Sequence, residues 1–334
     1  MAIINNKNIT HFLINRIDNI GDVVLTLPVC TYLKLLYPDI VITLLARSYT
    51  KPIADACPAI DHFIDYEELH KLPEKEQVAD IKKRNIDVIL HAFNRTEIAK
   101  LAKQAGIPIR IGNTSKNSHF IYCNKLIRLS RGNSHLHEAQ QMFMFLQPLG
   151  LTHIPSIGTL AGYYKDFYKP QAELPAELAA NLNPAKFNLI VHTLSNGHGR
   201  EWEMDKYAQL INRLPLDKFN VIITGSTKEA EVLNEWVKQL PAGVINLSGK
   251  MTLPELMSFI DRADGLLASG TGPLHMAAAS GIHALGLFPT SKSINALRWA
   301  PLGKKAEHIE SDGDDLSGIS VDMVLGRIND WITS

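Results

Sequence analysis

Short apolar runs alternate with amphipathic stretches along most of the chain, a pattern typical of parallel βα units. In the first half, apolar runs predict strands at Ile9–Asn15, Ile40–Ala46, Ile86–His91 and Pro108–Gly112. Amphipathic stretches predict helices at Asp22–Leu36, Val78–Arg84, Glu97–Gln104 and His137–Leu149.

The same alternation resumes after residue 186, beyond a segment at 151–186 with few periodic apolar positions. Apolar runs predict strands at Phe187–His192, Asn220–Thr224, Val244–Leu247, Gly265–Ala268 and Ala284–Phe288. Amphipathic stretches predict helices at Met204–Arg213, Lys228–Gln239, Leu253–Arg262, Pro273–Ser280 and Val321–Ile332.

The two halves predict an α/β protein with two Rossmann-like domains, each a doubly wound parallel sheet, that face a cleft. A chain of 334 residues is long enough for two such cores. We predict an N-terminal domain at residues 1–160, a linker at 161–186 and a second domain at 187–318. A C-terminal helix is predicted at 319–334, and packing back on the N-terminal domain is one arrangement open to it. Ligands bind at the carboxyl ends of parallel strands, so the active site is expected in the cleft.

Charge is balanced overall but unevenly distributed. Lys plus Arg and Asp plus Glu each number 34. Thirteen basic and five acidic residues lie between Lys71 and Arg131, whereas residues 301–334 hold three basic and seven acidic ones. A basic N-terminal half fits an acidic acceptor, a nucleic acid or an anionic membrane surface, and it also fits a merely solvated surface.

The cysteines and the N-terminal segment indicate a cellular compartment. Cys30, Cys57 and Cys123 have no CxxC spacing, so neither a disulfide framework nor a zinc site is predicted. The chain starts without a basic region followed by a long apolar stretch, and no window approaches 18 apolar residues. We therefore expect a cytoplasmic protein that could still dock on a membrane.

The first motif, Arg16–Asp22, joins the first predicted strand to the following helix. Gly21 allows a tight turn or a close approach of the backbone to a ligand. Asp22 stands where a carboxylate complements the positive end of a helix dipole, and simple N-capping is the alternative interpretation. A GxGxxG fingerprint is absent, which argues against an NAD-dependent enzyme.

The second motif, Ala268–His275, passes from a strand through two glycines and a threonine into a helix opened by Pro273. Free N–H groups and the helix dipole make such a terminus a natural anion site, to which Thr271 can add a hydroxyl donor. This pattern predicts phosphate binding. A well-capped structural helix with His275 packed on its flank is the alternative.

The third motif, His192–Trp202, is a polar loop after the first strand of the second half. The guanidinium of Arg200 could bind a diphosphate and offset the charge of a leaving group. The alternative is a mobile surface loop with Trp202 in the core.

Two further sequence patterns look like metal-binding motifs, but we interpret neither as a metal site. The acidic Asp312–Asp314 is interpreted as a solvated turn, and His135–Glu138 lacks the i, i+4 histidine pair of a zinc helix.

In this order, the three motifs resemble those of glycosyltransferase family 9, the lipopolysaccharide heptosyltransferases. The resemblance covers nearly the whole chain. Its most specific parts are IGDVVLTLP at Ile20–Pro28 and TGPLHMAAASG at Thr271–Gly281. The REW sequence at residues 200–202 is similar to a K-x-W segment of the family, and residues 250–253 are similar to the loop beside its adenine.

The resemblance implies a GT-B fold and an inverting transfer that needs neither a metal nor a cofactor. The implied donor is a nucleotide sugar, typically ADP-heptose. The implied acceptor is an acidic lipid-linked saccharide of the lipopolysaccharide core rather than a nucleic acid. Asp22 matches the catalytic carboxylate, which would take the proton of the acceptor hydroxyl. The residues assigned to donor binding are Thr193, Ser195, Arg200, Met251, Thr271, Gly272 and His275.

Two positions depart from the family pattern. Gly270 stands where the family often has an aspartate, and Phe288-Pro289-Thr290 is one glycine shorter than the usual F-G-P-T. Both departures bear on which donor sugar is used. Two alternative functions therefore stay open: a nucleotide-sugar epimerase of the same fold, and a catalytically silent nucleotide-binding protein of envelope biosynthesis.

Overall fold

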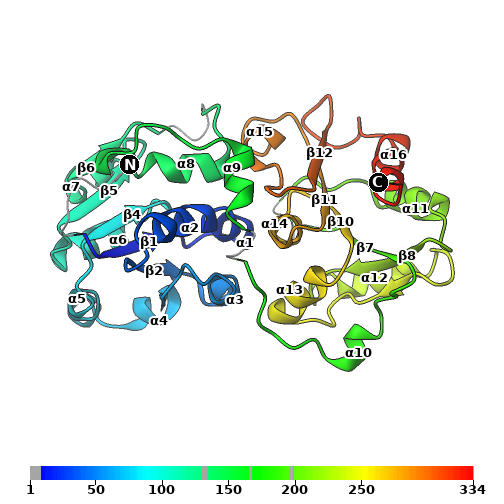
Figure 1. Cartoon of the computed structure of the whole chain (residues 1–334), viewed down its shortest axis with the longest axis horizontal. Coiled ribbons are helices and arrows are strands. Elements are labelled where there is room, and N and C mark those ends of the chain that lie inside the picture. Colours follow the sequence, from blue (N-terminus) through cyan, green and yellow to red (C-terminus); the bar gives the residue numbers. More distant parts are fainter. Residues whose placement is uncertain (1–8, 130–133, 165–167, 196, 198, 334) are drawn as a thin grey trace. The chain divides into compact units, whose positions relative to one another are not determined.

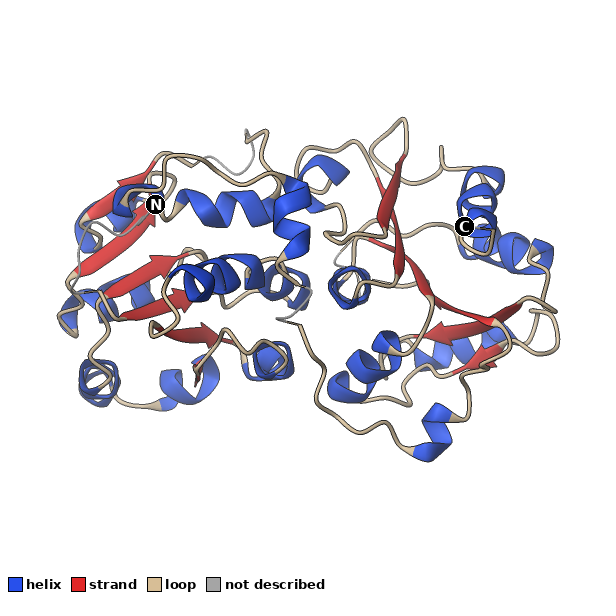
Figure 2. Cartoon of the chain, viewed as in Figure 1, coloured by secondary structure: helices blue, strands red, loops and turns tan. Residues whose placement is uncertain are grey.

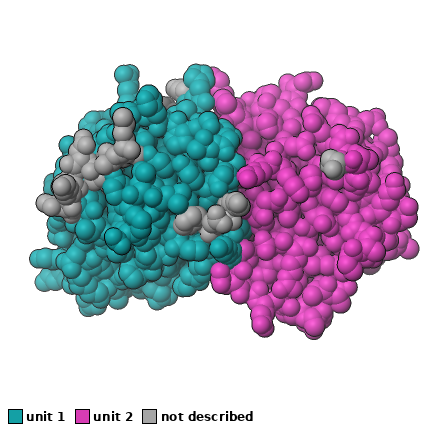
Figure 3. All heavy atoms as spheres, in the orientation of Figure 1, with its two compact units in different colours: residues 1–169 teal, residues 170–334 magenta. Residues whose placement is uncertain are grey.

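The structure is a computed structural model that describes residues 9–129, 134–164, 168–195, 197 and 199–333. The chain divides into two compact units, Met1–Lys169 and Pro170–Ser334, which Figure 3 shows in separate colours. The boundary after Lys169 lies inside segment 161–186. Each unit has its own sheet and its own core.

In unit 1, the described strands form a six-stranded parallel sheet in the order β3-β2-β1-β4-β5-β6 (Figure 1). The chain runs outward from β1 to β3 and then returns to the other side of β1, which is the doubly wound arrangement that the sequence predicted. The strands are β1 (His11–Asn15), β2 (Val41–Ala46), β3 (His62–Asp65), β4 (Val88–His91), β5 (Ile109–Asn113) and β6 (Lys125–Ile127).

Helices connect these strands (Figure 2). The described helices of unit 1 are α1 (Ile20–Val24), α2 (Leu27–Leu36), η1 (Ser48–Thr50), α3 (Lys51–Asp55), α4 (Tyr66–Lys71), α5 (Glu74–Lys83), α6 (Thr96–Gln104), α7 (Asn117–Tyr122), α8 (Glu138–Met144), η3 (Gln147–Leu149) and α9 (Ile157–Gly162).

Unit 2 repeats the topology of unit 1. Its described strands form a six-stranded parallel sheet in the order β12-β11-β10-β7-β8-β9, so the order reverses between β7 and β10. The strands are β7 (Phe187–His192), β8 (Phe219–Thr224), β9 (Ile245–Asn246), β10 (Gly265–Ser269), β11 (His283–Phe288) and β12 (Ala306–Glu310). The described helices are α10 (Ala176–Ala179), α11 (Met204–Arg213), α12 (Ala230–Val237), α13 (Leu253–Asp261), α14 (Gly272–Ser280), α15 (Ala296–Trp299) and α16 (Val321–Asp330).

Central strands were predictable because both faces of a parallel sheet are covered, so that nearly every residue is apolar and buried. Every residue of β1, β4, β8 and β10 is buried. The edge strands β3, β6 and β12 mix buried and exposed residues, and the apolar runs of the sequence did not reveal them. Helix α16 packs against α11, and its buried residues belong to the core of unit 2.

The helix predicted at Asp22–Leu36 is interrupted, and this part of the prediction was wrong. Helix α1 ends at Val24 and α2 begins at Leu27. Pro28 has no N–H to donate to the carbonyl of Val24, so a continuous helix would leave that oxygen without its i+4 partner. The hydroxyl of Tyr164 donates to the Val24 carbonyl instead, at 2.9 Å.

Candidate active site

Asp22 lies at the topological switch point of unit 1. Strand β1 pairs with β2 on one side and β4 on the other, and the loop after β1 leads directly into α1. In doubly wound sheets, loops at this point line the ligand crevice. The side chain of Asp22 is 13% exposed.

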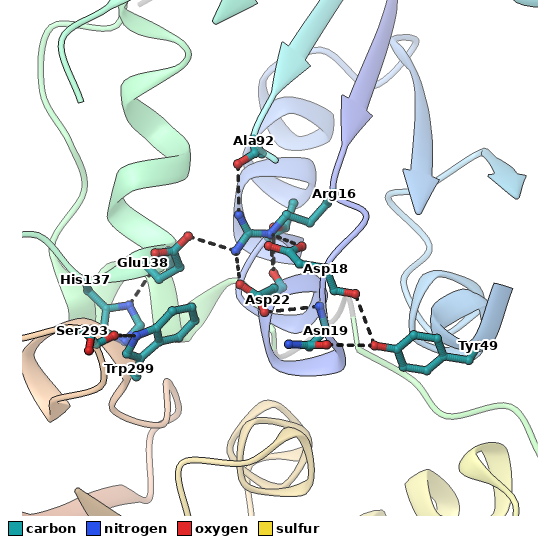
Figure 4. Close-up of polar contacts among 12 residues, drawn as sticks. Arg16, Asp18, Asn19, Asp22, Tyr49, Ala92, His137, Glu138, Ser293 and Trp299 are labelled. Carbon is teal, nitrogen blue, oxygen red and sulfur yellow. Dashed lines mark hydrogen bonds and ion pairs between the residues drawn. The ribbon is translucent and has the colours of Figure 1, made fainter. Parts of the chain in front are cut away.

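A buried arginine holds this carboxylate (Figure 4). Nη2 of Arg16 donates to Oδ1 of Asp22 at 2.6 Å and to Oε1 of Glu138 at 2.9 Å. Its Nε lies 3.1 Å from a carboxylate oxygen of Asp18, and its Nη1 donates to the carbonyl of Ala92, just after β4, at 3.4 Å. Arg16 therefore ties the loop after β1 to the loop after β4 across the switch point.

The charges of this cluster are strongly coupled. The side chains of Arg16 and Glu138 have no exposed surface. Burial by itself lowers the pKa of Arg16, but Asp18, Asp22 and Glu138 outweigh it, and the net pKa is raised. The guanidinium of Arg16 contacts three carboxylates at once, so it can fix the orientation of Asp22.

The sequence prediction missed the roles of Arg16 and Glu138. The available signal was an arginine directly after a buried strand, where a charge needs a partner.

Capping of α1, the alternative interpretation of Asp22, is also present. Oδ2 of Asp22 accepts the N–H of Asn19 at 3.3 Å and closes a capping box. Capping and the ion pair use different oxygens, so both can hold at once.

The switch point of unit 2 brings together two of the predicted motifs. Strand β7 pairs with β10, so the loop that carries residues 193–201 starts beside the loop at 270–271. A Cβ placed on Gly199 would lie only 3.7 Å from the carbonyl oxygen of Gly270. The second and third motifs are therefore neighbours.

Three hydroxyl groups at this switch point are buried. They belong to Thr193, Ser269 and Thr271, and none has a hydrogen-bond partner within the described part of the chain. Thr271 is the N-cap residue of α14, yet its side chain makes no capping hydrogen bond. The side-chain cap that the structural alternative expects at Thr271 is therefore not observed, whereas His275 is buried, as that alternative expects. A buried hydroxyl without a partner is costly, and an anionic ligand could accept a hydrogen bond from it.

Gly272 and His275 lie in the first turn of α14. The helix begins at Gly272, one residue earlier than predicted, and Pro273 contributes no N–H. His275 is buried, and its backbone N–H donates to the carbonyl of Thr271 at 3.5 Å. The geometry combines the positive end of a helix dipole with an unused threonine hydroxyl.

Glu201 organises the 193–201 loop. Its Oε1 accepts the backbone N–H of Ser195 at 2.7 Å and the Ser195 hydroxyl at 2.8 Å. The Ser195 Oγ in turn accepts the N–H of Gly199 at 3.2 Å. Ser195 therefore shapes the loop, and its hydroxyl is already engaged. Asn196 and His198, which belong to the same predicted motif, lie outside the described residues.

Arg200 contacts the acidic C-terminal loop. Its Nε donates to the carbonyl of Asp314 at 3.1 Å, and its side chain is exposed. The Gly313 carbonyl in that loop accepts the Thr290 N–H at 2.9 Å. The Asp312–Asp314 turn is thus hydrogen-bonded to two other segments of unit 2.

Trp202, at the end of the third motif, is buried, as the alternative interpretation of that motif expected. Its Nε1 donates to the Ile319 carbonyl at 3.0 Å.

Met251 stands on a separate loop of unit 2. It follows β9 and precedes Thr252, whose capping box with Glu255 begins α13. Helix α13 packs against α14, the helix that Thr271 precedes. The helix that follows Met251 therefore packs against the helix that follows Thr271. Strand β9, which precedes Met251, lies two strands away from β7 in the sheet.

The two departures from the family pattern meet in space. A Cβ on Gly270 would lie 2.8 Å from Cε1 of Phe288, closer than side chains approach without a shift. Phe288 is buried at the end of β11. Its ring occupies the space that an acidic side chain at position 270 would need.

The described residues contain no group of three or more His, Cys, Asp or Glu side chains placed to hold a metal ion. Within the same residues, no helix is long and apolar enough to cross a membrane.

Comparison with solved structures places this architecture in a known fold class. A structure of a family 9 glycosyltransferase from Veillonella parvula matches with a TM-score of 0.78 at 18% identity, covering 99% of each chain. The Escherichia coli ADP-heptose lipopolysaccharide heptosyltransferase II matches with a TM-score of 0.74 at 20% identity, covering 97% of this chain and 98% of that one. Two such doubly wound units form the GT-B fold, as the resemblance implied.

The family follows from the sequence. Residues 78–317 match the model of glycosyltransferase family 9 (heptosyltransferase). A Haemophilus influenzae protein assigned to the glycosyltransferases is 29% identical over 96% of this chain and 98% of its own length. Lipopolysaccharide heptosyltransferase 3 of E. coli is 24% identical over 84% of each chain. The chain belongs to glycosyltransferase family 9 and is a heptosyltransferase-like glycosyltransferase.

Proposed function

We propose that this enzyme transfers heptose from ADP-heptose onto a saccharide of the lipopolysaccharide core, with inversion and without a metal. The donor and acceptor follow from relatives described as lipopolysaccharide heptosyltransferases at 24% identity. The observation that carries the proposal is what each switch point holds, taken within its own unit. One presents the Asp22 carboxylate held by Arg16, and the other presents unused hydroxyls at a helix terminus.

Asp22 is the proposed general base. Its carboxylate keeps some exposure, and a buried arginine fixes its direction, so an acceptor hydroxyl can donate to it. Glu138 and Asp18 lie on the same guanidinium, but Glu138 has no exposed surface. Asp22 is therefore better placed than Glu138 to meet an acceptor.

The proposed donor seat surrounds the start of α14. The Thr193 and Thr271 hydroxyls donate to the diphosphate, and the N–H groups of the first turn, Gly272 included, add their dipole. Arg200 supplies a full positive charge, while His275 and Ser195 shape the seat. Met251 contacts the adenine through its backbone. Together these groups stabilise the negative charge that builds on the leaving group.

The reaction is a single in-line displacement. The acceptor oxygen forms a bond to the anomeric carbon as the bond from that carbon to the diphosphate oxygen breaks. The acceptor proton passes to Asp22, and the electron pair of the broken bond leaves with the nucleoside diphosphate.

The partners follow from this chemistry. They are a nucleotide-sugar donor and an acidic lipid-linked acceptor, met in the cytoplasm at the inner face of the inner membrane. The basic stretch between Lys71 and Arg131 suits an acidic acceptor. Family membership favours transfer over the epimerase and the silent binding protein. The structure of a UDP-N-acetylglucosamine 2-epimerase matches with a TM-score of only 0.50.

A donor screen followed by a transfer assay tests the proposal. Thermal shifts with ADP, UDP and GDP should show ADP preference, and ADP-heptose with a core acceptor should release ADP in the presence of a chelator. Preference for UDP or GDP would refute the donor assignment. Conversion of the nucleotide sugar without any acceptor would instead identify an epimerase.

A further inference from the structure

An apolar and basic surface lies at one edge of unit 1. We call it the α7–β6 surface and define it by seven exposed residues from the end of α6, from α7, from β6 and from the flanks of α7 and β6. Strand β6 ends the sheet, three places along from β1 (Figure 1). The surface consists of Lys103, Lys116, Phe120, Ile121, Lys125, Leu126 and Arg128.

Three large apolar side chains are exposed here. Phe120 is 58% exposed, Ile121 is 62% and Leu126 is 37%. Leu126 pairs with Gly112, and a Cβ on Gly112 would point at His119 and Cys123, at the end of α7. Paired residues of neighbouring strands point to the same face of a sheet. Leu126 therefore points to the face of the sheet that α7 covers, and α7 is the helix that carries Phe120 and Ile121.

The charge around these side chains is entirely positive along the sequence. No Asp or Glu occurs between Glu97 and Glu138. Nζ of Lys103 donates to the Ile121 carbonyl at 3.1 Å and lies 5.8 Å from the Tyr122 ring. Among the described residues, no Asp or Glu side chain lies within ion-pair distance of Lys116, Lys125 or Arg128, the remaining basic members.

Protection of the sheet edge does not explain this surface. A lysine on an edge strand such as Lys125 discourages pairing with other strands. Edge protection would not leave Phe120 and Ile121 in water, because exposed apolar groups promote association. Another exposed pair, Leu35 and Leu36, is followed by Asp39 and lacks the basic surroundings.

We propose that the α7–β6 surface docks the protein on an anionic lipid bilayer. Phe120, Ile121 and Leu126 enter the interface between headgroups and acyl chains, and the basic side chains meet the anionic headgroups. An anionic bilayer complements the positive charge of this surface, whereas a second copy of the same basic surface would be repelled. Docking does not depend on the transfer chemistry.

Vesicle sedimentation tests the proposal on the full chain. Wild type should bind phosphatidylcholine vesicles that contain about one third phosphatidylglycerol, and bind pure phosphatidylcholine far more weakly. Each basic residue near an anionic surface contributes about fivefold in binding. The Lys116→Gln/Lys125→Gln/Arg128→Gln variant should therefore bind about 100-fold more weakly, and Phe120→Ser/Ile121→Ser should lose about tenfold or more.

Matched controls come from unit 2. Val232→Ser removes an equally exposed apolar residue, and Lys218→Gln/Lys292→Gln/Lys304→Gln removes three exposed charges. Both variants should bind vesicles like wild type. Thermal shifts with ADP on every variant report the proposed donor site separately, so a missing ADP response with intact vesicle binding refutes only the proposed function.

Equal vesicle binding by wild type and by both surface variants would overturn the docking proposal. So would an absence of binding to anionic vesicles. If light scattering then showed a dimer that Phe120→Ser/Ile121→Ser dissociates, the surface would be a contact between copies of the chain.

Discussion

The two switch points of this enzyme have the same topology but opposite states of hydrogen bonding. In unit 1, Arg16 joins Asp22 and Glu138 in a buried ionic cluster whose members hold one another in place. In unit 2, the hydroxyls of Thr193 and Thr271 are buried, and within the described residues they meet no acceptor.

Under the proposed mechanism, this difference assigns one half of the chemistry to each unit. A general base must point in one direction before the acceptor arrives, and a buried ion pair provides that fixed geometry. A phosphate seat needs donors that are not already used, so its hydrogen bonds stay open until a ligand closes them. The following changes should break or sharpen this contrast.

The largest expected effect is that of Asp22→Asn. The amide cannot accept a proton as a base, so we expect kcat to fall by about 10²–10⁴-fold. ADP affinity, measured by calorimetry, should stay close to wild type because the proposed donor seat lies in unit 2. Unchanged turnover would reduce Asp22 to a capping residue.

Arg16→Met should destabilise unit 1. It leaves Glu138 buried without its cationic partner, and such a loss costs about 3–5 kcal/mol in the free energy of unfolding. Urea denaturation measures this cost. Arg16→Lys should recover part of the stability but less of kcat, because an ammonium does not reproduce the forked contacts of guanidinium. Full stability in Arg16→Met would contradict the anchoring role.

Thr271→Val should weaken ADP binding while leaving stability nearly unchanged. A hydrogen bond to a charged group contributes about 1.5–3 kcal/mol, which is about 10–100-fold in Kd. Ser320→Ala is the matched control, because Ser320 does cap its helix, with its Oγ 3.3 Å from the Met323 nitrogen. That variant should lose about 1 kcal/mol of stability and no ADP affinity. The reverse outcome would make Thr271 an ordinary cap.

Gly270→Ala should be destabilising by about 1–3 kcal/mol, because its Cβ meets the Phe288 ring. Phe288→Leu in the same chain should relieve much of that cost. A double-mutant cycle of melting temperatures measures the coupling between the two positions. Additive effects would show that the two departures from the family pattern are independent.

Arg200→Ala should have the smallest effect. The side chain is exposed, and exposed charge pairs contribute about 0.2–1 kcal/mol, so ADP affinity should fall by about fivefold at most. The loss should shrink further as salt is raised. Calorimetry that shows no change at low salt would remove Arg200 from the donor seat.

The sequence predicted the parts of the fold that depend on local pattern. Central strands such as β10 are runs of buried residues, and the amphipathic period of α11 matched its observed bounds. Edge strands such as β6 were missed because they are short and partly exposed, so that they lack a continuous run of buried apolar residues. The break before Pro28 was missed because a proline near a helix start is also a favourable signal.

For the site, the sequence by itself determined where the candidate chemistry lies: Asp22 after the first strand and Thr271 before α14, because a loop after a buried strand is a local feature. Only the tertiary structure decided how these groups are held. Arg16 and Glu138 are 122 positions apart, and no pattern along the chain reports that their side chains meet. Whether Thr271 caps its helix or keeps its hydroxyl unused is decided by side-chain geometry, and the same residues in the same order are compatible with either.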